Sequence, residues 1–537
     1  MSKRILVCSE AHYLNTGYGV MYKQILDRLH RDGYEVAEHA TYGKISHLQN
    51  HKIPWKFYPN EPEGDDPEHS DYKSNILYQF GLYRFDKVVL HFKPDIVFGC
   101  RDIWMDEHIV NSPLSKYYTS ILAPPIDSTP QPVNYLASYN KADYLMPLSD
   151  WGVEVMKSEI RKQNISLLGF GVDLDVFKPM DKVEIRKKWG LNPDAQIFGT
   201  VMRNQARKLY PALIKTFSRF LDEHPKQRNN TYLYLHAAYP DKRGWNLSEL
   251  ITEYGVHSNV ICTYCCSVCN HKFIRQWSDA KTTCNNCGSI AGFHPNVLVG
   301  LSREELAEVY NIMDFYIQYS EKEGGGFPIV EAAACGVYTC APPYTAMKSA
   351  VKNLDIFELD YIVRRSFNDQ SDICTPNDKH LLTLMGSYRK LPYYRRYMSE
   401  EEYKKHIRKL AEKHYNWEDV YQRLKFVIDS SKPKNWNEPA NINEVPNDFI
   451  VPTNEHFLRY LQQEVDIYGT AISQKRLLDI QRDLFYGYEV KQEPEIITDK
   501  SKKAIIEATH TRMLREFWCE SVRQGKIQLK QEPFLCL

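Results

Sequence analysis

The stretch EKEGGGFPIVEAAACG, residues 321–336, places Glu323 and Glu331 eight positions apart, with three consecutive glycines and a proline between them. A strand-like run precedes it, and the pattern predicts a helix that begins at Pro328 and ends at Gly336. Glycine backbone before a helix start exposes N–H groups, and the positive end of the helix dipole favours an anion such as phosphate. We place Glu331 in the first helical turn, where its carboxylate can accept hydrogen bonds from a diol. Glutamates eight apart occur by chance, so the whole string predicts the ligand loop.

Strand and helix patterns alternate along the chain in two series, the first starting at RILVC (4–8) and the second at QIFGTV (196–201). This alternation predicts an α/β protein with two doubly wound, Rossmann-like domains that face a cleft, with ligands at the carboxyl ends of the strands. We divide the chain into a first domain (1–178), a second domain (179–428), a cysteine-rich insertion (262–293), a linker rich in Pro and Asn (429–456) and a helical C-terminal extension (457–537).

Length and charge limit the function classes. A chain of 537 residues is too long for one hydrophobic core. Its 68 basic residues balance 68 acidic residues, so no chain-wide field attracts nucleic acid or anionic membrane. No apolar run approaches the ~18 residues of a transmembrane helix, and the first residues do not resemble a signal peptide. We therefore predict a cytoplasmic protein without a transmembrane segment.

Six of the 13 cysteines fall between residues 262 and 287, in close pairs. Two pairs with two intervening residues each predict a closed tetrahedral site for a structural Zn²⁺ ion. The predicted ligands are Cys266, Cys269, Cys284 and Cys287. Cys262 and Cys265 form a third pair, which either replaces Cys266 and Cys269 or consists of spare thiols. The sequence thus predicts a zinc ribbon inserted in the second domain.

The predicted ribbon carries three basic residues, Lys272, Arg275 and Lys281, with Phe273 and Trp277 among them. Basic residues interleaved with aromatic ones suit nucleic acid. Alternatively, the cations offset the charge of about −2 that four thiolates leave on zinc, and the aromatic side chains form the core of the small insertion. Both interpretations remain open at the level of sequence.

The string with Glu323 and Glu331 resembles the E-x7-E motif of retaining nucleotide-sugar glycosyltransferases of GT-B fold, the group that includes sucrose and glycogen synthases. NTGYGVMYKQILDRLHRDGYEV (15–36) is similar to the first glycine loop and helix of that group, and GFGVDLDVFKP (169–179) to the segment that opens its second domain. The resemblance covers about residues 3–425. It implies a GT-B fold in which the first domain binds the acceptor and the second domain binds a nucleotide-diphosphate sugar as donor.

The resemblance implies roles for individual residues. Glu331 would bind the ribose of the nucleotide, and Glu323 would contact the donor sugar. Arg203 and Lys208 are similar to the Arg and Lys that hold the diphosphate, and Arg207 is the neighbour that could be confused with Lys208. Fixed positive groups of this kind stabilise the charge that develops on the leaving diphosphate, typically by a few kcal/mol.

The remaining candidates lie in the loops. Five backbone positions are assigned to donor binding: Gly17, Gly19, Gly325, Gly326 and Phe327. Asp127, in APPIDSTP, is placed where the acceptor domain faces the cleft and could orient the acceptor. In the family that the sequence resembles, transfer is thought to go by front-side attack, with the donor phosphate helping to take the proton of the acceptor, so no dedicated base is implied.

These features predict a retaining glycosyltransferase whose acceptor hydroxyl belongs to a glycan, a lipid-linked sugar, a protein or a hydroxymethylated base in DNA. The DNA acceptor rests on the ribbon and on the GT-B fold of viral DNA-base glucosyltransferases, which is an analogy at the level of fold. One alternative is a zinc-ribbon module that binds nucleic acid on an inactive transferase fold. Another is a sugar-nucleotide isomerase, which the E-x7-E string disfavours.

Overall fold

The computed structural model describes residues 2–436 except 15, 45, 48–52, 65–68, 83, 163, 297–298, 368–369 and 393–396. The predicted helical extension (457–537) lies outside the described residues, as does the predicted linker (429–456) from residue 437 onward. None of the helices in the described part of the chain is long and apolar enough to cross a membrane.

The first sheet has six parallel strands in the order β3-β2-β1-β4-β5-β6. The strands are β1 Arg4–Glu10, β2 Glu35–Thr41, β3 Lys56–Pro59, β4 Ile96–Gly99, β5 Thr119–Leu122 and β6 Tyr144–Leu145. The helices are α1 Gly17–Arg31, α2 His69–Ser74, α3 Ile76–Gln79, α4 Phe85–Phe92, α5 Ile103–Asn111, α6 Val133–Lys141 and α7 Asp150–Glu159. The residues of β1, β4 and β5 are nearly all buried, as expected for parallel strands that helices cover on both faces. The strand order reverses between β1 and β4, where sheets of this kind bind ligands.

The second sheet repeats this topology in the order β9-β8-β7-β13-β14-β15, all parallel, and β10, β11 and β12 extend it antiparallel at the β9 edge. The strands are β7 Gln196–Val201, β8 Thr231–His236, β9 Val260–Cys266, β10 Lys272–Gln276, β11 Thr282–Thr283, β12 Ile290–Phe293, β13 Phe315–Ile317, β14 Tyr338–Ala341 and β15 Phe357–Glu358. A separate hairpin consists of β16 Tyr361–Arg365 and β17 Asp372–Pro376. The helices are α8 Lys182–Lys188, α9 Tyr210–Glu223, α10 Leu247–Glu253, α11 Arg303–Ile312, α12 Phe327–Ala334, α13 Ala346–Leu354, α14 Asp378–Ser387, α16 Glu400–His414 and α17 Trp417–Ser430. The predicted α/β architecture with two doubly wound sheets is confirmed.

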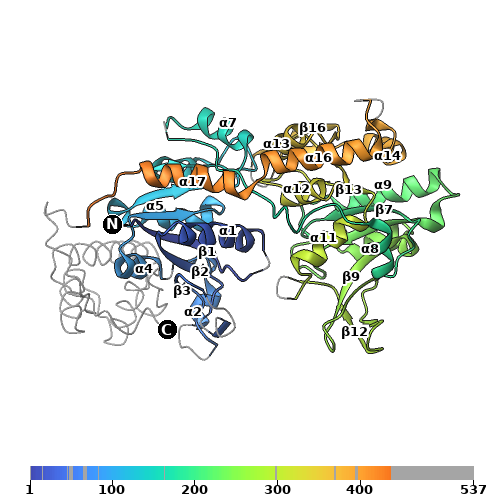
Figure 1. Ribbon diagram of the computed structural model, residues 1–537, viewed down its shortest axis with the longest axis horizontal. Helices are drawn as coiled ribbons and strands as arrows, with labels where there is room; N and C mark the ends of the chain where they lie inside the picture. Colours follow the sequence, from blue (N-terminus) through green and yellow to red (C-terminus); the bar gives the residue numbers. More distant parts are fainter. Residues whose placement is uncertain are drawn as a thin grey trace, which may run out of the picture.

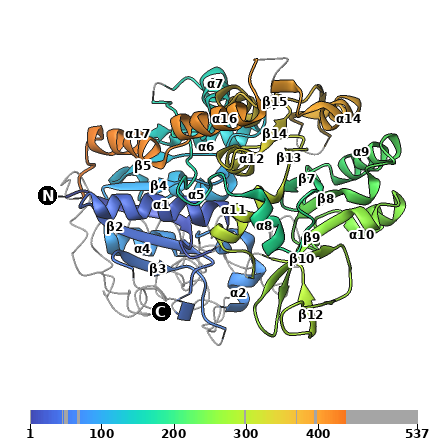
Figure 2. The ribbon, with the colours of Figure 1, turned by 45° about the vertical axis from the view of Figure 1, so that its right-hand side comes forward.

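The last described helix returns to the first sheet (Figures 1 and 2). Near the start of α17, Glu418 accepts hydrogen bonds of 3.0 Å from both terminal nitrogens of Arg31 in α1. Beyond its end, Trp436 stacks on Tyr117, with the ring centroids 4.8 Å apart. Residues 431–436, at the start of the predicted linker, therefore pack against the first domain.

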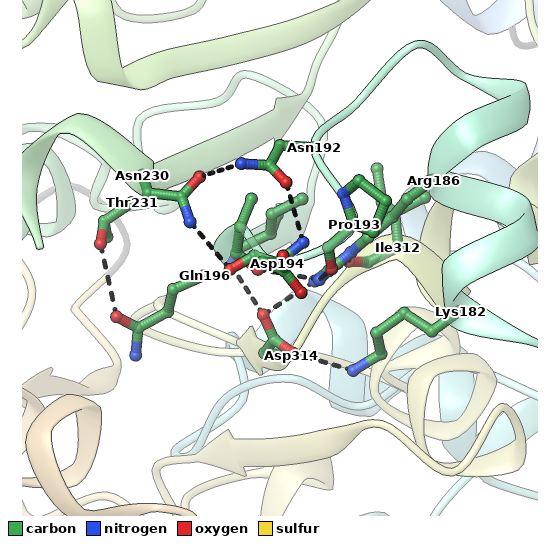
Figure 3. A network of polar contacts seen from close by, with 12 residues as sticks. Lys182, Arg186, Asn192, Pro193, Asp194, Gln196, Asn230, Thr231, Ile312 and Asp314 are labelled. Atoms are coloured by element: carbon green, nitrogen blue, oxygen red, sulfur yellow. Dashed lines mark hydrogen bonds and ion pairs between the residues drawn. The ribbon is translucent and has the colours of Figure 1, made fainter.

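A buried polar network fixes α8 to the second sheet (Figure 3). Asp314 accepts hydrogen bonds from Lys182 (2.9 Å), from Arg186 (2.8 Å) and from the amide of Ile197 (2.8 Å). Arg186 is buried and also donates to the carbonyl oxygen of Ile312 (2.7 Å). Burial alone would raise the pKa of Asp314, but the charges of Lys182 and Arg186 lower it below its ordinary value. One carboxylate thus joins the starts of β7 and β13 to α8.

We expect Asp314→Asn to destabilise the protein by about 3 kcal/mol or more, because two largely buried cations lose their counter-charge. Urea unfolding at neutral pH measures this loss. Asp194→Asn, which removes an exposed carboxylate from the adjoining loop, is the matched control and should change little. Because the folded-state pKa of Asp314 is lowered, its contribution is complete above the pKa of an unfolded aspartate and is lost as the pH falls through the folded pKa. The difference between wild type and variant should therefore shrink below about pH 4; equal effects of both substitutions would contradict the role of Asp314.

Candidate functional site

Glu323 is the centre of a buried polar cluster beyond the carboxyl end of β13. Its Oε1 contacts the ammonium group of Lys208 and accepts a hydrogen bond of 2.7 Å from Gln318, and its Oε2 accepts one of 2.9 Å from Arg207. The amide of Glu323 donates to the hydroxyl of Thr345 at 3.0 Å. The carboxylate thus has three side-chain donors, two of them cationic, and its orientation is fixed.

Lys208 is buried beside two charged neighbours. Burial lowers the pKa of Lys208 well below its ordinary value, Arg207 adds to this effect, and Asp127 opposes it. The direct contact with the carboxylate of Glu323 favours the charged ammonium. We therefore treat the two groups as an ion pair that places positive charge at the carboxyl edge of the sheet.

Arg203 does not join this cluster. Its side chain is 61% exposed, and its Nε lies 3.4 Å from a carboxylate oxygen of Asp241. Its charge acts instead on Glu10, at the carboxyl end of β1 in the other sheet. The structure therefore brings Arg207, not Arg203, together with Lys208; the sequence reasoning named Arg207 only as a neighbour of Lys208.

The glycine loop leads into α12 as predicted, with differences in detail. Gly326 has a φ of +97° and precedes the first helical residue, Phe327, and no side chain caps the helix start. A Cβ on Gly324 would lie 2.5 Å from the carbonyl oxygen of Pro125 in the first domain, so this glycine permits the close contact between the domains. At Gly325 a Cβ would make only ordinary contacts. The uncapped N–H groups that remain suit an anionic ligand.

Glu331 is the fifth residue of α12, so the prediction that it lies in the first turn is wrong. The left-handed conformation of Gly326 starts the helix at Phe327, before the proline, and the dipole acts only weakly in the second turn. The hydroxyl of Tyr310 donates to Oε2 of Glu331 at 2.9 Å, and a guanidinium nitrogen of Arg303 lies 3.9 Å from Oε1. Burial raises the pKa of Glu331, and Arg303 and Tyr310 oppose this. Its carboxylate retains the capacity to accept further hydrogen bonds.

The first glycine loop lies at the carboxyl end of β1. Thr16 caps α1 by accepting a hydrogen bond of 3.0 Å from the amide of Gly19, and its hydroxyl donates to Glu10. Gly17 is the first residue of α1, and a Cβ there would meet no atom within 4 Å. A Cβ on Gly19 would clash with the carbonyl oxygen of Leu14, so position 19 requires glycine, whereas position 17 does not.

Asp127 lies where the two domains meet. Its side chain is partly exposed, and a carboxylate oxygen is 3.8 Å from the ammonium group of Lys322, the residue before Glu323. The structure thus brings Asp127 to the loop that contains Lys322 and Glu323.

The sequence analysis missed Asp102, which follows β4 and is the residue before α5. A short polar residue before a helix normally indicates a cap, but the Asp102 side chain makes no capping hydrogen bond. The hydroxyl of Tyr18 lies 3.4 Å from its Oδ2. Burial raises the pKa of Asp102 to about 7, Asp127 adds to this, and Arg207 opposes it. Because Asp102 occupies the position of a helix cap, the sequence pattern gave no sign that its carboxyl group lies near Arg207 of the second domain.

The four predicted cysteine ligands converge. Their sulfur atoms lie within 4.8 Å of one another, with Sγ–Sγ distances of 3.6 Å for Cys266 and Cys287 and 3.7 Å for Cys269 and Cys284. Tetrahedral zinc with Zn–S bonds of ~2.3 Å requires Sγ–Sγ distances of ~3.8 Å, so the donor set fits this ion. The third pair lies on β9 outside the cluster, and Cys262 Sγ is 3.8 Å from Nδ1 of His294.

The aromatic side chains of the insertion are not placed to stack on nucleic-acid bases. Phe273 and Trp277 are 1% and 5% exposed, and the indole N–H of Trp277 donates to the hydroxyl of Ser248 at 2.7 Å. They form the core between the insertion and the second domain, which was the alternative interpretation. Arg275 and Lys281 are exposed, whereas Lys272 binds Asn270 through its ammonium group.

Neither a protein-family model nor a curated protein sequence matches this chain. Several solved structures do match. Sucrose-phosphate synthase of Thermosynechococcus elongatus is similar with a TM-score of 0.56 at 13% identity, over 80% of this chain and 98% of that chain. A glycosyltransferase of Rickettsia africae (TM-score 0.52, 14% identity) and Anabaena HepE in complex with UDP-glucose (TM-score 0.53, 13% identity) each match over 80% of this chain and their full length. At these identities the likeness concerns the fold alone: this chain has the GT-B fold that its sequence predicts.

Proposed function

We propose that this protein is a retaining glycosyltransferase that transfers a sugar from a nucleotide-diphosphate sugar to an acceptor hydroxyl. The observation that carries the proposal is the convergence of Glu323, Lys208 and Arg207 beside the uncapped start of α12, with Glu331 in the next turn of the same helix. A GT-B structure of similar fold, Anabaena HepE, was solved with UDP-glucose, which supports a nucleotide-sugar donor.

Each group has a role in this reaction. The N–H groups at the start of α12, with Lys208 and Arg207, would hold the diphosphate, and the free capacity of Glu331 would bind the ribose hydroxyls. When the bond between the sugar C1 and the phosphate oxygen breaks, its electron pair stays on the diphosphate, where these cations stabilise it. The acceptor oxygen bonds to C1 on the same face, and its proton passes to the departing phosphate. Arg203, which the sequence also assigned to the diphosphate, is paired with Asp241 and lies outside this cluster.

Cys266, Cys269, Cys284 and Cys287 would hold one structural Zn²⁺. Four thiolates close the coordination sphere, so the ion would supply rigidity and no reactive position. Two strands of the cysteine-rich insertion, β10 and β12, pair with β9. The first residues of β9 pair in turn with β8 of the second sheet. The metal site would therefore stabilise the edge of the donor-binding domain.

The acceptor remains a proposal among several. A hydroxymethylated DNA base is consistent with the exposed Arg275 and Lys281 but loses the support of Phe273 and Trp277, which are buried. A glycan needs no contact from the ribbon, and we favour it. An inactive fold that only binds nucleic acid would not need the ion pair of Glu323 with Lys208, which is costly to bury.

We expect Glu331→Ala to weaken binding of a nucleotide sugar by roughly 1.5–3 kcal/mol, about 10- to 150-fold, because ribose hydroxyls lose a charged acceptor. Titration calorimetry with UDP-, ADP- and GDP-sugars identifies the donor and measures the loss. Glu304→Ala, which removes an exposed glutamate from α11, is the control and should leave the affinity unchanged. Equal affinities of wild type and Glu331→Ala would remove this residue from the site.

Lys208→Met should lower kcat by about 100-fold or more while changing donor affinity much less, because the ammonium charge matters most as the diphosphate leaves. Donor affinity from calorimetry and kcat from product formation separate the two effects. Thermal unfolding checks that the variant stays folded without the ion pair of Lys208 and Glu323. Equal losses in kcat and affinity would show that Lys208 binds donor and transition state alike.

Purified protein should contain about one zinc per chain, and Cys284→Ser should release it, since the closed site requires four thiolates. Metal analysis by plasma mass spectrometry gives the stoichiometry. Cys262→Ser is the matched control: this buried thiol lies outside the cluster, so the variant should keep its metal. Zinc retained in Cys284→Ser but lost in Cys262→Ser would reverse the ligand assignment.

A further inference from the structure

The acceptor-side half of the site presents carboxyl groups and tyrosines towards the donor-side cations. Asp102 follows β4, Asp127 follows β5, and Tyr18 lies in the first turn of α1. Tyr135, in α6, is partly exposed and lies close enough to both carboxyl groups for their charges to raise its pKa, after the effect of burial. These four residues come from four elements at the carboxyl edge of the first sheet.

The cationic residue next to Asp102 in the sequence, Arg101, is not available to a ligand. Arg101 is 2% exposed. Its Nε donates to Asp106 at 2.8 Å, and its Nη1 donates to the hydroxyl of Thr41 at 2.6 Å. Arg101 is therefore committed to contacts within the first domain. The neighbouring Asp102 makes no capping hydrogen bond to α5, so its carboxyl group can bind a ligand.

Charge at this edge already opposes a further anion. After the larger effect of burial, the negative charge of Asp127 raises the pKa of Asp102, so one carboxylate at this edge already disfavours a second negative charge. The titratable and charged groups around Asp102 are Tyr18, Cys100, Asp106, Asp127, Tyr135, Tyr139 and, from the donor-side domain, Arg207. Arg207 is bound to Glu323 and to the carbonyl oxygen of Lys322, so its charge is partly neutralised. Lys322, a further cation at this edge, is paired with Asp127 at 3.8 Å, so a phosphate group placed here would lie beside carboxyl groups and beside cations that already have carboxylate partners.

We propose, on the basis of the proposed function, that the acceptor is an uncharged polyhydroxyl compound whose hydroxyls bind Asp102 and Asp127, and that this edge rejects phosphorylated acceptors. Carboxylates accept hydrogen bonds from hydroxyl groups, and a protonated Asp102 can also donate one. The partly exposed rings of Tyr18 and Tyr135 offer apolar faces for a sugar ring. The cations of the site lie on the donor side, where the diphosphate would occupy them.

The test compares neutral acceptors with their phosphates. Using the donor that calorimetry identifies, transfer is measured to glucose, fructose and methyl glucosides and to the corresponding 6-phosphates. We expect kcat/KM for the neutral acceptors to exceed that for the phosphates by about 100-fold, the size of effect that like charges at short distance produce. Asp102→Asn should raise the acceptor KM by about tenfold, as expected for a lost charged hydrogen bond, and should leave donor affinity unchanged.

The pH profile separates a binding role of Asp102 from a structural one. In the wild type, the acceptor KM should change across pH values near 7, where Asp102 titrates, and this change should disappear in Asp102→Asn. Asp27→Asn, which removes an exposed carboxylate of α1 paired with Lys23, is the matched control and should retain the wild-type profile. Asp127→Asn, a second variant, should raise the acceptor KM even if Asp102→Asn does not fold.

The outcomes distinguish this inference from the proposed function. If the wild type binds none of the nucleotide sugars, the proposed function itself fails. If it binds a donor but uses phosphates as well as neutral acceptors, or uses no neutral polyol at all, the acceptor inference is overturned and the donor site stands. An unchanged acceptor KM and pH profile in both Asp102→Asn and Asp127→Asn would likewise overturn it.

Discussion

A buried carboxylate needs hydrogen-bond donors, and the arrangement of the site depends on the side chains that donate to Glu323. Left without partners in the interior, its charge would cost several kcal/mol. Lys208 and Arg207 reach it because their loop runs antiparallel to the loop before Glu323: the amide of Leu209 donates to Tyr319 at 3.1 Å, and that of Glu321 donates to Arg207 at 2.9 Å. The side-chain cluster therefore rests on backbone hydrogen bonds between the segments that follow β7 and β13. This places two cations beside the start of α12 before any ligand is present, which is the preorganisation that electrostatic catalysis requires.

The two domains meet at this point with complementary charge. Lys322 lies 3.8 Å from Asp127, and Gly324 leaves room for Pro125, so the loop before α12 touches the loop after β5 directly. The hairpin of β16 and β17 adds a further contact, since the amide of Asp372 donates to Thr129 at 2.8 Å. The domains thus meet here through an ion pair, a close backbone approach and a backbone hydrogen bond.

The sequence predicted the strands and helices better than the side-chain contacts between distant loops, for physical reasons. QIFGTV and TYLYLH became strands β7 and β8 because a strand buried on both faces is a continuous apolar run, which is visible in the sequence. The glycine string indicated the loop before α12 because glycine readily adopts the left-handed backbone conformation found at Gly326. The choice between Arg203 and Arg207 depended on which side chain reaches Glu323 across two loops, and no local pattern encodes this. Asp102 was missed because a carboxyl group before a helix looks the same whether it caps the helix or faces another domain. The assignment of the catalytic and binding roles stays a prediction.

In the cysteine-rich insertion, the sequence specified the cluster of thiols but not the role of the aromatic residues. The spacing of the cysteines predicted four ligands, and their sulfur atoms lie within 4.8 Å of one another. The prediction succeeds because two cysteines separated by two residues lie in one tight turn. The aromatic residues of the insertion were ambiguous, because stacking on a base and packing in a small core require the same side chains. The structure resolves this through β9: Val260 and Ile261 pair with β8 of the central sheet, and the following residues pair with β10. An insertion that continues a sheet must cover its own inner face, and Phe273 and Trp277 are the residues that do so. The insertion therefore covers the edge strand β9 that the second sheet would otherwise leave open, and unpaired strand edges need such cover.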